Sequence, residues 1–227
     1  GLPLIHDHVP DVRVPQGYLA TNTEELQEAQ RLLKDRGHEL LILKPTLGSA
    51  GEGITTIEST TDLGSYSFPL GPVLVEERFT IDTDRDGREL APSIQYLDGK
   101  LGKPTDQILH GMTHAGNRYP SHCSAQFQSE FTTLSERILA WAKPRGPGGF
   151  DVLSIEGKPV LIDINLGRWT GAHPVSFFQG LYAPNTCFTS WKYVPKNDMD
   201  VWTFWNKLHQ KGIALVPGAT TEGVFPI

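Results

Sequence analysis

Two short apolar segments, residues 150–155 and 159–164, constrain the fold of this 227-residue chain more than any other feature. Each has the length and the β-branched or aromatic content of a strand. Only Glu156-Gly157 and one lysine separate them, and this dipeptide suits a tight turn. The pattern therefore predicts a β-hairpin. In a hairpin, the start of the first strand lies opposite the end of the second.

Acidic and amide side chains stand at the two ends that this hairpin brings together. Asp151 opens the first strand, and Asp163 and Asn165 close the second. Residues two apart in a strand point to the same face. Two carboxylates and an amide oxygen are hard donors suited to Mg²⁺ (or Mn²⁺) shared with phosphates. The sequence predicts a metal site here, although residues that end strands at the water surface would leave the same pattern.

A lysine at a strand end, followed by a glycine-rich loop, predicts a phosphate-binding hairpin. The apolar run 40–43 ends at Lys44, and β-branched residues 54–57 predict a returning strand. Glycines let backbone amides approach phosphate oxygens, and lysine supplies a point charge. The expected phosphate-binding residues are Lys44, Gly48, Ser49, Gly51 and Gly53. No Gly-Lys-Ser/Thr closes the loop, so it is not a Walker A loop. A solvated lysine beside a flexible turn is the alternative.

A second apolar strand, residues 73–75, runs into Glu76, Glu77 and Phe79. Such a strand end can offer backbone groups to an adenine edge and a carboxylate to a ribose, so these three residues are further candidates for nucleotide binding. An edge strand that runs into solvent is the alternative. The charged residues 82–88 that follow predict an exposed turn.

The loop after the predicted metal ligands holds two candidate catalytic residues. Arg168 offers a two-pronged donor for an anion. His173 is the best placed of four histidines that could move a proton, the others being His110, His114 and His122. Polar residues that could line an acceptor site are Ser93, Gln95, Gln107 and Arg118.

Composition narrows the class of partner. The formal net charge is −6, which argues against a nucleic-acid partner, because phosphate backbones attract basic surfaces. No apolar run approaches the roughly 20 residues of a membrane helix, so no membrane partner is expected. The two cysteines, Cys123 and Cys187, form neither a disulfide framework nor a zinc pattern, which favours the cytoplasm.

The order and spacing of Lys44 with its glycine loop, Glu76-Glu77, Asp151 and Asp163-x-Asn165 resemble the ATP-grasp superfamily over roughly residues 10–180. The resemblance implies an α+β fold in which two α+β subdomains clamp ATP between antiparallel sheets. Residues 1–78 would form the small subdomain and 79–227 the large one. Asp163 stands where this superfamily more often has Glu, which shortens the reach to the metals and keeps the charge.

Three further segments resemble the pheganomycin-type peptide ligases, which carry a separate pre-ATP-grasp domain. They are Ala91–Gln95, Asp106–Leu109 and Thr170–Pro174. This finer resemblance implies that such a domain precedes residue 1.

The resemblance implies an ATP-dependent carboxylate–amine ligase that uses Mg²⁺ or Mn²⁺. An acyl phosphate would form, ADP and phosphate would leave, and an amide or peptide bond would result. The partners would be a small carboxylate and an amine, expected to be an amino acid, and the family habit is a homodimer. Three alternatives remain open at this point: an acid–thiol ligase, a carboxylase, and a non-catalytic nucleotide-binding regulatory module.

Overall fold

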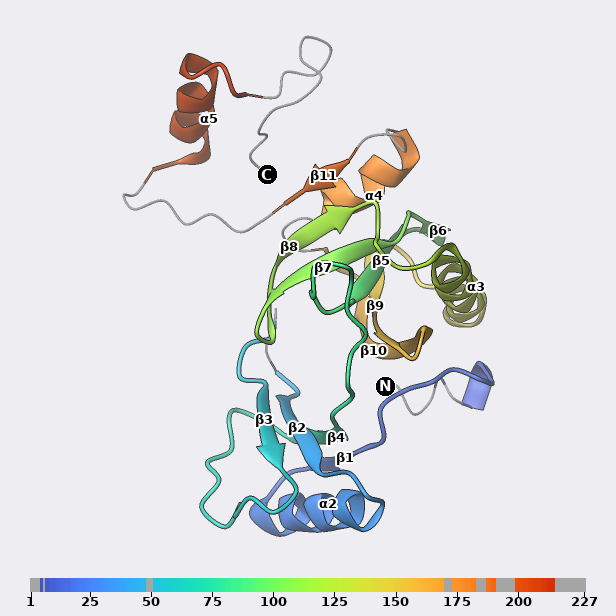
Figure 1. The fold of residues 1–227 in the computed structure, drawn as a ribbon, viewed down its shortest axis with the longest axis vertical. Coiled ribbons are helices and arrows are strands. Elements are labelled where there is room, and N and C mark those ends of the chain that lie inside the picture. Colours follow the sequence, from blue (N-terminus) through green and yellow to red (C-terminus); the bar gives the residue numbers. More distant parts are fainter. Residues whose placement is uncertain are drawn as a thin grey trace. The chain divides into compact units, whose positions relative to one another are not determined.

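The apolar strands pair into two sheets, in which every pairing between strands is antiparallel (Figure 1). This computed structural model describes residues 5, 7–47, 51–169, 173–182, 187–190 and 199–214. The chain divides into two units, Gly1–Ser190 and Trp191–Ile227. All the described strands belong to the first unit, and helix α5 (Val201–Gln210) belongs to the second.

The four-stranded sheet has the strand order β1-β4-β2-β3. Its strands are β1 (Gly17–Ala20), β4 (Val73–Glu77), β2 (Leu40–Pro45) and β3 (Thr55–Glu58). Helix α2 (Thr23–Asp35) covers one face, where Leu26 and Leu33 are buried with Leu41 and Val75. Side chains alternate along a strand, so Lys44 and Glu76 lie on the face away from α2.

Local capping decides where α2 begins. The side chain of Asn22 accepts a hydrogen bond from Glu25 N at 2.9 Å, and the Glu25 carboxylate accepts one from Thr21 N at 2.7 Å. These two bonds satisfy amides that the first helical turn leaves free. Helix α2 therefore begins directly after Asn22, which is its N-cap. Gly37, at φ +89°, follows the last turn.

The seven-stranded sheet has the order β10-β9-β5-β7-β8-β11, with β6 paired to β5. Its strands are β5 (Pro92–Leu97), β6 (Lys100–Leu101), β7 (Thr105–His110), β8 (Thr113–Tyr119), β9 (Pro147–Ile155), β10 (Lys158–Leu166) and β11 (Phe188–Thr189). The predicted hairpin of residues 150–155 and 159–164 is confirmed as β9 and β10, which extend beyond it at both ends.

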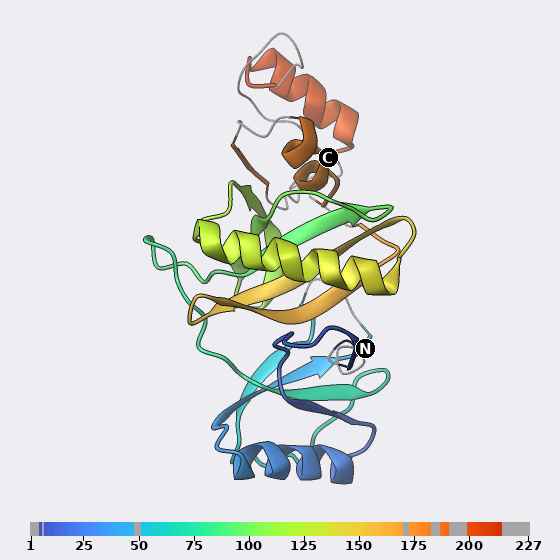
Figure 2. The ribbon, with the colours of Figure 1, turned by 90° about the vertical axis from the view of Figure 1, so that its right-hand side faces the viewer.

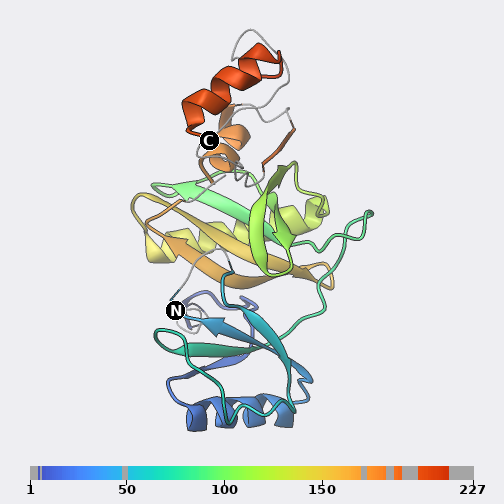
Figure 3. The same ribbon diagram turned by 90° about the vertical axis from the view of Figure 1, so that its left-hand side faces the viewer.

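Helix α3 (Ala125–Ala142) lies across one face of this sheet, as Figure 2 shows, and Figure 3 shows the sheet from the other side. Phe127 and Phe131 of α3 share a buried core with Ile94, Tyr96 and Phe150 of the sheet. The helix begins directly after Ser124, whose hydroxyl caps it by accepting a hydrogen bond from Phe127 N at 3.1 Å.

A β-bulge in β10 controls which face of the sheet Asp163 occupies. Leu161 pairs with Val152 and Asp163 pairs with Asp151, so Ile162 is an extra residue without a partner in β9. Leu161 packs into the core under α3. Without the extra residue, Leu161 and Asp163 would point to the same face, because side chains alternate with a period of two. The bulge therefore turns Asp163 away from α3.

Helix α4 (His173–Tyr182) packs against β5 and β8. The sequence pattern predicts neither α4 nor the hairpin of β7 and β8. Among the described residues, no helix has the length and apolar character needed to cross a membrane.

Candidate functional site

Lys44 reaches from the four-stranded sheet to the larger one. Its ammonium group donates a hydrogen bond to the carbonyl of Ile162, at an Nζ–O distance of 3.1 Å. Ile162 is the bulged residue of β10, and its neighbour in sequence is Asp163. The strand that ends in Lys44 and the bulge that redirects Asp163 thus bring a cation and an acid from the two sheets into one region.

The three predicted metal ligands lie on neighbouring strands. Asp151 and Asp163 are cross-strand partners in β9 and β10, and Asn165 stands two residues beyond Asp163 on the same face. The Asn165 amide donates to Asp151 Oδ2 at 3.0 Å. One oxygen of Asp163 accepts from Ile164 N at 2.8 Å.

The region holds more acids than bases. Burial and the charge of Asp163 together raise the pKa of Asp151 to about 7, against the lowering effects of the Asn165 amide and Lys44. Burial also raises the pKa of Glu76, where Lys44 opposes the shift and Asp163 adds to it. The charge of Asp163 therefore acts on both Asp151 and Glu76, and the charge of Lys44 opposes it at both. A bound cation would relieve this excess of negative charge.

The donor set fits a metal that is shared with phosphates. In the part of the chain that the structure describes, no group of three His, Cys, Asp or Glu side chains could by itself hold a metal ion. Mg²⁺ usually takes only one or two protein carboxylates and completes its octahedron with phosphate oxygens and water. Two carboxylates and one amide on adjacent strands match that habit.

Comparison with known proteins identifies the fold. No family model matches the sequence, and no curated protein matches it. Among solved structures, an ADP complex of N5-carboxyaminoimidazole ribonucleotide synthetase superposes with a TM-score of 0.58 at 13% identity, covering 76% of this chain and 47% of that one. Biotin carboxylase from Campylobacter jejuni gives 0.58 at 18% identity, over 73% and 39%. D-alanyl-alanine synthetase A from Vibrio cholerae gives 0.55 at 20% identity, over 81% and 59%.

The chain has the ATP-grasp fold. At these identities the likeness is one of fold. The chain spans between 39% and 59% of the length of the three solved chains.

The residues predicted to bind the nucleotide fall on different parts of this ATP-grasp fold. Glu76 lies on the face with Lys44, but Glu77 lies on the opposite face. There its carboxylate accepts from Gln16 N at 2.8 Å and lies 3.3 Å from His38 Nδ1. Phe79 packs against a small apolar cluster that includes Leu153. The structure therefore does not bring Glu77 next to Lys44, and the roles of all three residues stay predictions.

Part of the predicted phosphate loop lies outside the described residues, namely Gly48 and Ser49. Gly51 and Gly53 are described and have φ values of +79° and +77°, which residues with a Cβ rarely adopt. A Cβ at Gly51 would also overlap the carbonyl of Met112, at the turn between β7 and β8. Glycine is required at residue 51 by backbone geometry and by this close approach.

Of the two predicted catalytic residues, Arg168 is exposed and His173 is buried at the start of α4. Burial, together with the positive charges of His114 and Arg168, lowers the pKa of His173 to about 4, so its imidazole is neutral at pH 7. The rings of His114 and His173 lie 5.9 Å apart. Residues 170–172, between the two candidates, lie outside the described part.

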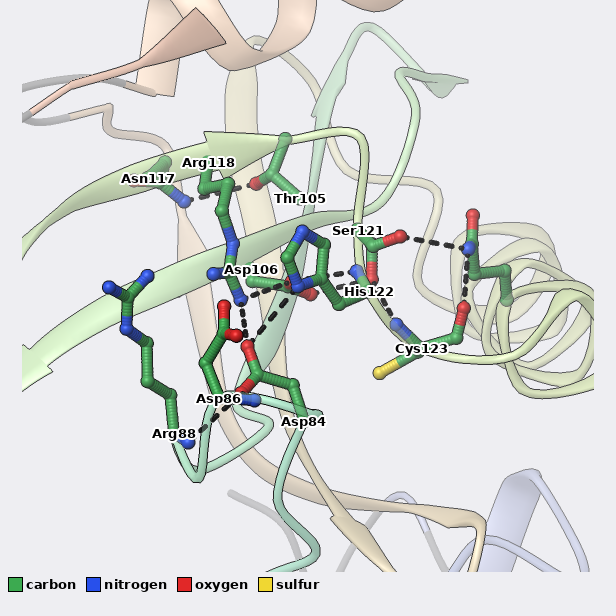
Figure 4. Close-up of polar contacts among 11 residues, drawn as sticks. Asp84, Asp86, Arg88, Thr105, Asp106, Asn117, Arg118, Ser121, His122 and Cys123 are labelled. Carbon is green, nitrogen blue, oxygen red and sulfur yellow. Dashed lines mark hydrogen bonds and ion pairs between the residues drawn. The ribbon is translucent and has the colours of Figure 1, made fainter. Parts of the chain in front are cut away.

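The prediction of an exposed turn at residues 82–88 is wrong for Asp84. Its side chain is 2% exposed and lies 3.0 Å from the Arg118 guanidinium, which also contacts Asp106 at 3.1 Å (Figure 4). The turn folds back on the sheet because these charges pair with each other. The Arg118 guanidinium therefore pairs with two carboxylates on the α3 side of the sheet, beside a cavity of about 290 Å³. It does not join the acids of the candidate site.

Proposed function

We propose that this chain is the ATP-binding and catalytic part of a ligase that joins a carboxylate to an amine through an acyl phosphate. The observation that carries the proposal is the meeting of Lys44 with Glu76, Asp151 and Asp163 between the two sheets of an ATP-grasp fold. A lysine beside three carboxylates suits a triphosphate with its metal ions. In this proposal residues 1–78 form the small subdomain and residues 79–227 the large one.

The first step would transfer the γ-phosphoryl group of ATP. An oxygen of the substrate carboxylate attacks the γ-phosphorus, the bond to the β-phosphate oxygen breaks, and ADP leaves with that electron pair. Lys44 would hold phosphate oxygens and offset the charge that spreads over them. Asp151, Asp163 and Asn165 would hold Mg²⁺ or Mn²⁺, which supplies further positive charge to the phosphates when bound.

The second step would form the amide. The amine lone pair attacks the acyl carbon, the bond from that carbon to the phosphate oxygen breaks, and phosphate leaves with the electron pair. Arg168 is proposed to steady the negative oxygen in between. His173, neutral at pH 7, is proposed as a group that can accept the proton that the amine loses. The likeness of residues 91–95, 106–109 and 170–174 to peptide ligases supports an amino acid as the amine.

The test is ADP release from Mg²⁺-ATP in the presence of pooled amino acids. We expect ADP only with certain pools, and at least a roughly 100-fold lower rate in Asp163→Ala, because the metal loses one of two carboxylates. Asp35→Ala, an exposed acid on α2, is the matched control and should keep the full rate. The acyl phosphate is checked by trapping it with hydroxylamine.

The other outcomes distinguish the alternatives. Two of the three similar structures are, by name, a carboxylase and a carboxyaminoimidazole ribonucleotide synthetase, so the same fold serves more than one acceptor. ADP release with thiols, and with no amino acid, would replace the amine in this proposal by a thiol. ADP release with bicarbonate, and with no amino acid, would replace the substrate carboxylate by bicarbonate. ATP binding without ADP release under any condition would favour a regulatory nucleotide-binding module.

A further inference from the structure

A row of uncharged polar side chains lies on the same sheet face as the predicted metal ligands. Ser93 is the cross-strand partner of Asp151, and Gln95 is the partner of Gly149, whose other partner is Asn165. The row continues across β7 and β8. We call Ser93, Gln95, Thr105 and Asn117 the polar row, and each is at most 1% exposed.

Hydrogen bonds join the side chains of the polar row to one another. The Asn117 amide donates to Thr105 Oγ1 at 3.0 Å and to Ser93 Oγ at 3.3 Å. The Gln95 amide donates to Ser93 Oγ at 3.0 Å. His114 Nε2 lies 2.9 Å from Asn117 Oδ1, which links the row to the histidine beside His173.

Two buried oxygens, one in the polar row and one on α4, lack partners among the described residues. No described residue gives a hydrogen bond to Gln95 Oε1 on β5 or to Ser176 Oγ on α4, the helix that packs against β5. Both residues are 1% exposed. Leaving a buried polar atom unpaired is costly, so native proteins rarely keep one without a purpose. Gln95 Oε1 can only accept a hydrogen bond, so its missing partner is a donor.

We propose that the polar row and Ser176 form the subsite for the amine substrate, an inference that rests on the proposed function. An amine attacks only when it is unprotonated, and the side chains of the row offer neutral acceptors for its N–H groups. Gln95 pairs with Gly149, and Gly149 pairs with Asn165, so the three residues form one row across β5, β9 and β10. An amine bound to Gln95 would therefore lie on the same sheet face as the acyl phosphate. Both oxygens are sealed from solvent in the unliganded protein, so an amine could reach them only if α4 moved away from β5.

The experiment is steady-state kinetics and thermal unfolding of Ser176→Ala and Gln95→Met, using the amino acid that supports ADP release by the wild type. We expect each variant to raise KM for that amino acid roughly 2- to 10-fold, as for the loss of one hydrogen bond. KM for ATP should not change. Ser176→Ala should unfold at the wild-type temperature or above it, because it removes an oxygen that has no partner in the unliganded protein.

Two matched variants control for the loss of a buried polar group elsewhere. Ser135→Ala removes a buried hydroxyl on α3 that donates to Phe131 O at 2.8 Å. Gln30→Met removes a buried amide on α2 that donates to Thr61 O at 2.8 Å. Both should lower stability, and neither should change KM for the amino acid.

Distinct results would overturn the two proposals. If the wild type releases ADP with an amino acid but Ser176→Ala and Gln95→Met keep the wild-type KM for that amino acid, the polar row is not the amine subsite. A lower unfolding temperature in Ser176→Ala would then show that bound water satisfies the Ser176 hydroxyl. If KM for ATP rises instead, the row serves the nucleotide. If the wild type releases ADP with no amino acid, the proposed function fails, and the amine subsite with it.

Discussion

At the scale of single residues, Asp84 shows how far burial and pairing can change the behaviour of a charged turn. Burial alone would raise the pKa of its carboxyl group. Hydrogen bonds from Arg88 N and Asp86 N, and from the side chains of Arg118 and His122, outweigh burial and lower that pKa below its ordinary value. A carboxylate with a lowered pKa stabilises the folded state whenever it is ionised.

We expect Asp84→Asn to lower the free energy of unfolding by about 2 kcal/mol or more at pH 7, since it breaks a buried ion pair while Asp106 still accompanies Arg118. The pKa of Asp84 in the folded protein lies below the unfolded value of about 3.9. The difference in free energy of unfolding between the wild type and Asp84→Asn should therefore persist above about pH 5. It should narrow as the pH falls below about 4. Urea unfolding at several pH values measures this.

Asp86→Asn is the matched control, because Asp86 is an exposed acid of the same turn, and it should change stability by less than about 0.5 kcal/mol. Equal losses in Asp84→Asn and Asp86→Asn would contradict the buried pair as the cause.

At the scale of elements, β5, β9 and β10 must approach closely for the site face to form. A Cβ at Gly149 would overlap Oε1 of Gln95 on the neighbouring strand. Gln95 is held by its bond to Ser93 and is buried, so it has little freedom to move aside. Gly149 is therefore required by its neighbour, since its own strand conformation is open to any residue.

We expect Gly149→Ala to lower the free energy of unfolding by about 1–3 kcal/mol, the usual cost of overpacking a dense interior. In a protein that already carries Gln95→Ala, Gly149→Ala should cost much less free energy of unfolding than in the wild type, because the overlapping side chain is gone. A double-mutant cycle in urea measures this difference. Gly64→Ala, in an exposed turn, should be nearly neutral. Additive losses in the cycle would show that the contact between residues 149 and 95 is not the source.

At the scale of the whole first unit, Lys44 joins the two sheets by its hydrogen bond to the carbonyl of Ile162. A ligand bound between the sheets stabilises the folded protein by an amount set by its concentration and its dissociation constant. Because Lys44 comes from β2 and its hydrogen-bond partner from β10, the nucleotide should act on both sheets at once.

We expect Mg²⁺-ATP at about 100 times its Kd to stabilise the wild type by about 2.7 kcal/mol, seen as a higher Tm. Lys44→Met should lose roughly 10-fold or more in affinity, since bonds to charged groups contribute about 1.5–3 kcal/mol, and its gain should fall below about 1.5 kcal/mol. Lys34→Met, on the exposed face of α2, should keep the full gain. A full Tm gain in Lys44→Met would remove Lys44 from the nucleotide site.

The sequence by itself determined the local elements and the fold class. The hairpin of β9 and β10, the strands around Lys44 and Val73, and the start of α2 follow from apolar spacing, turn residues and caps, which act over a few neighbouring residues. The likeness to ATP-grasp proteins added the α+β class with two antiparallel sheets, and this prediction is confirmed.

Only the tertiary structure decided which side chains meet. The extra residue Ile162 sets the face of Asp163. The pairing of Gln95 with Gly149, which also pairs with Asn165, assigns Gln95 to the site face. Arg118 buries the side chain of Asp84 within an otherwise exposed turn. These outcomes depend on register and on contacts between residues far apart in the chain. A pattern of neighbouring letters does not record them, because a shift of one residue reverses every side chain of a strand.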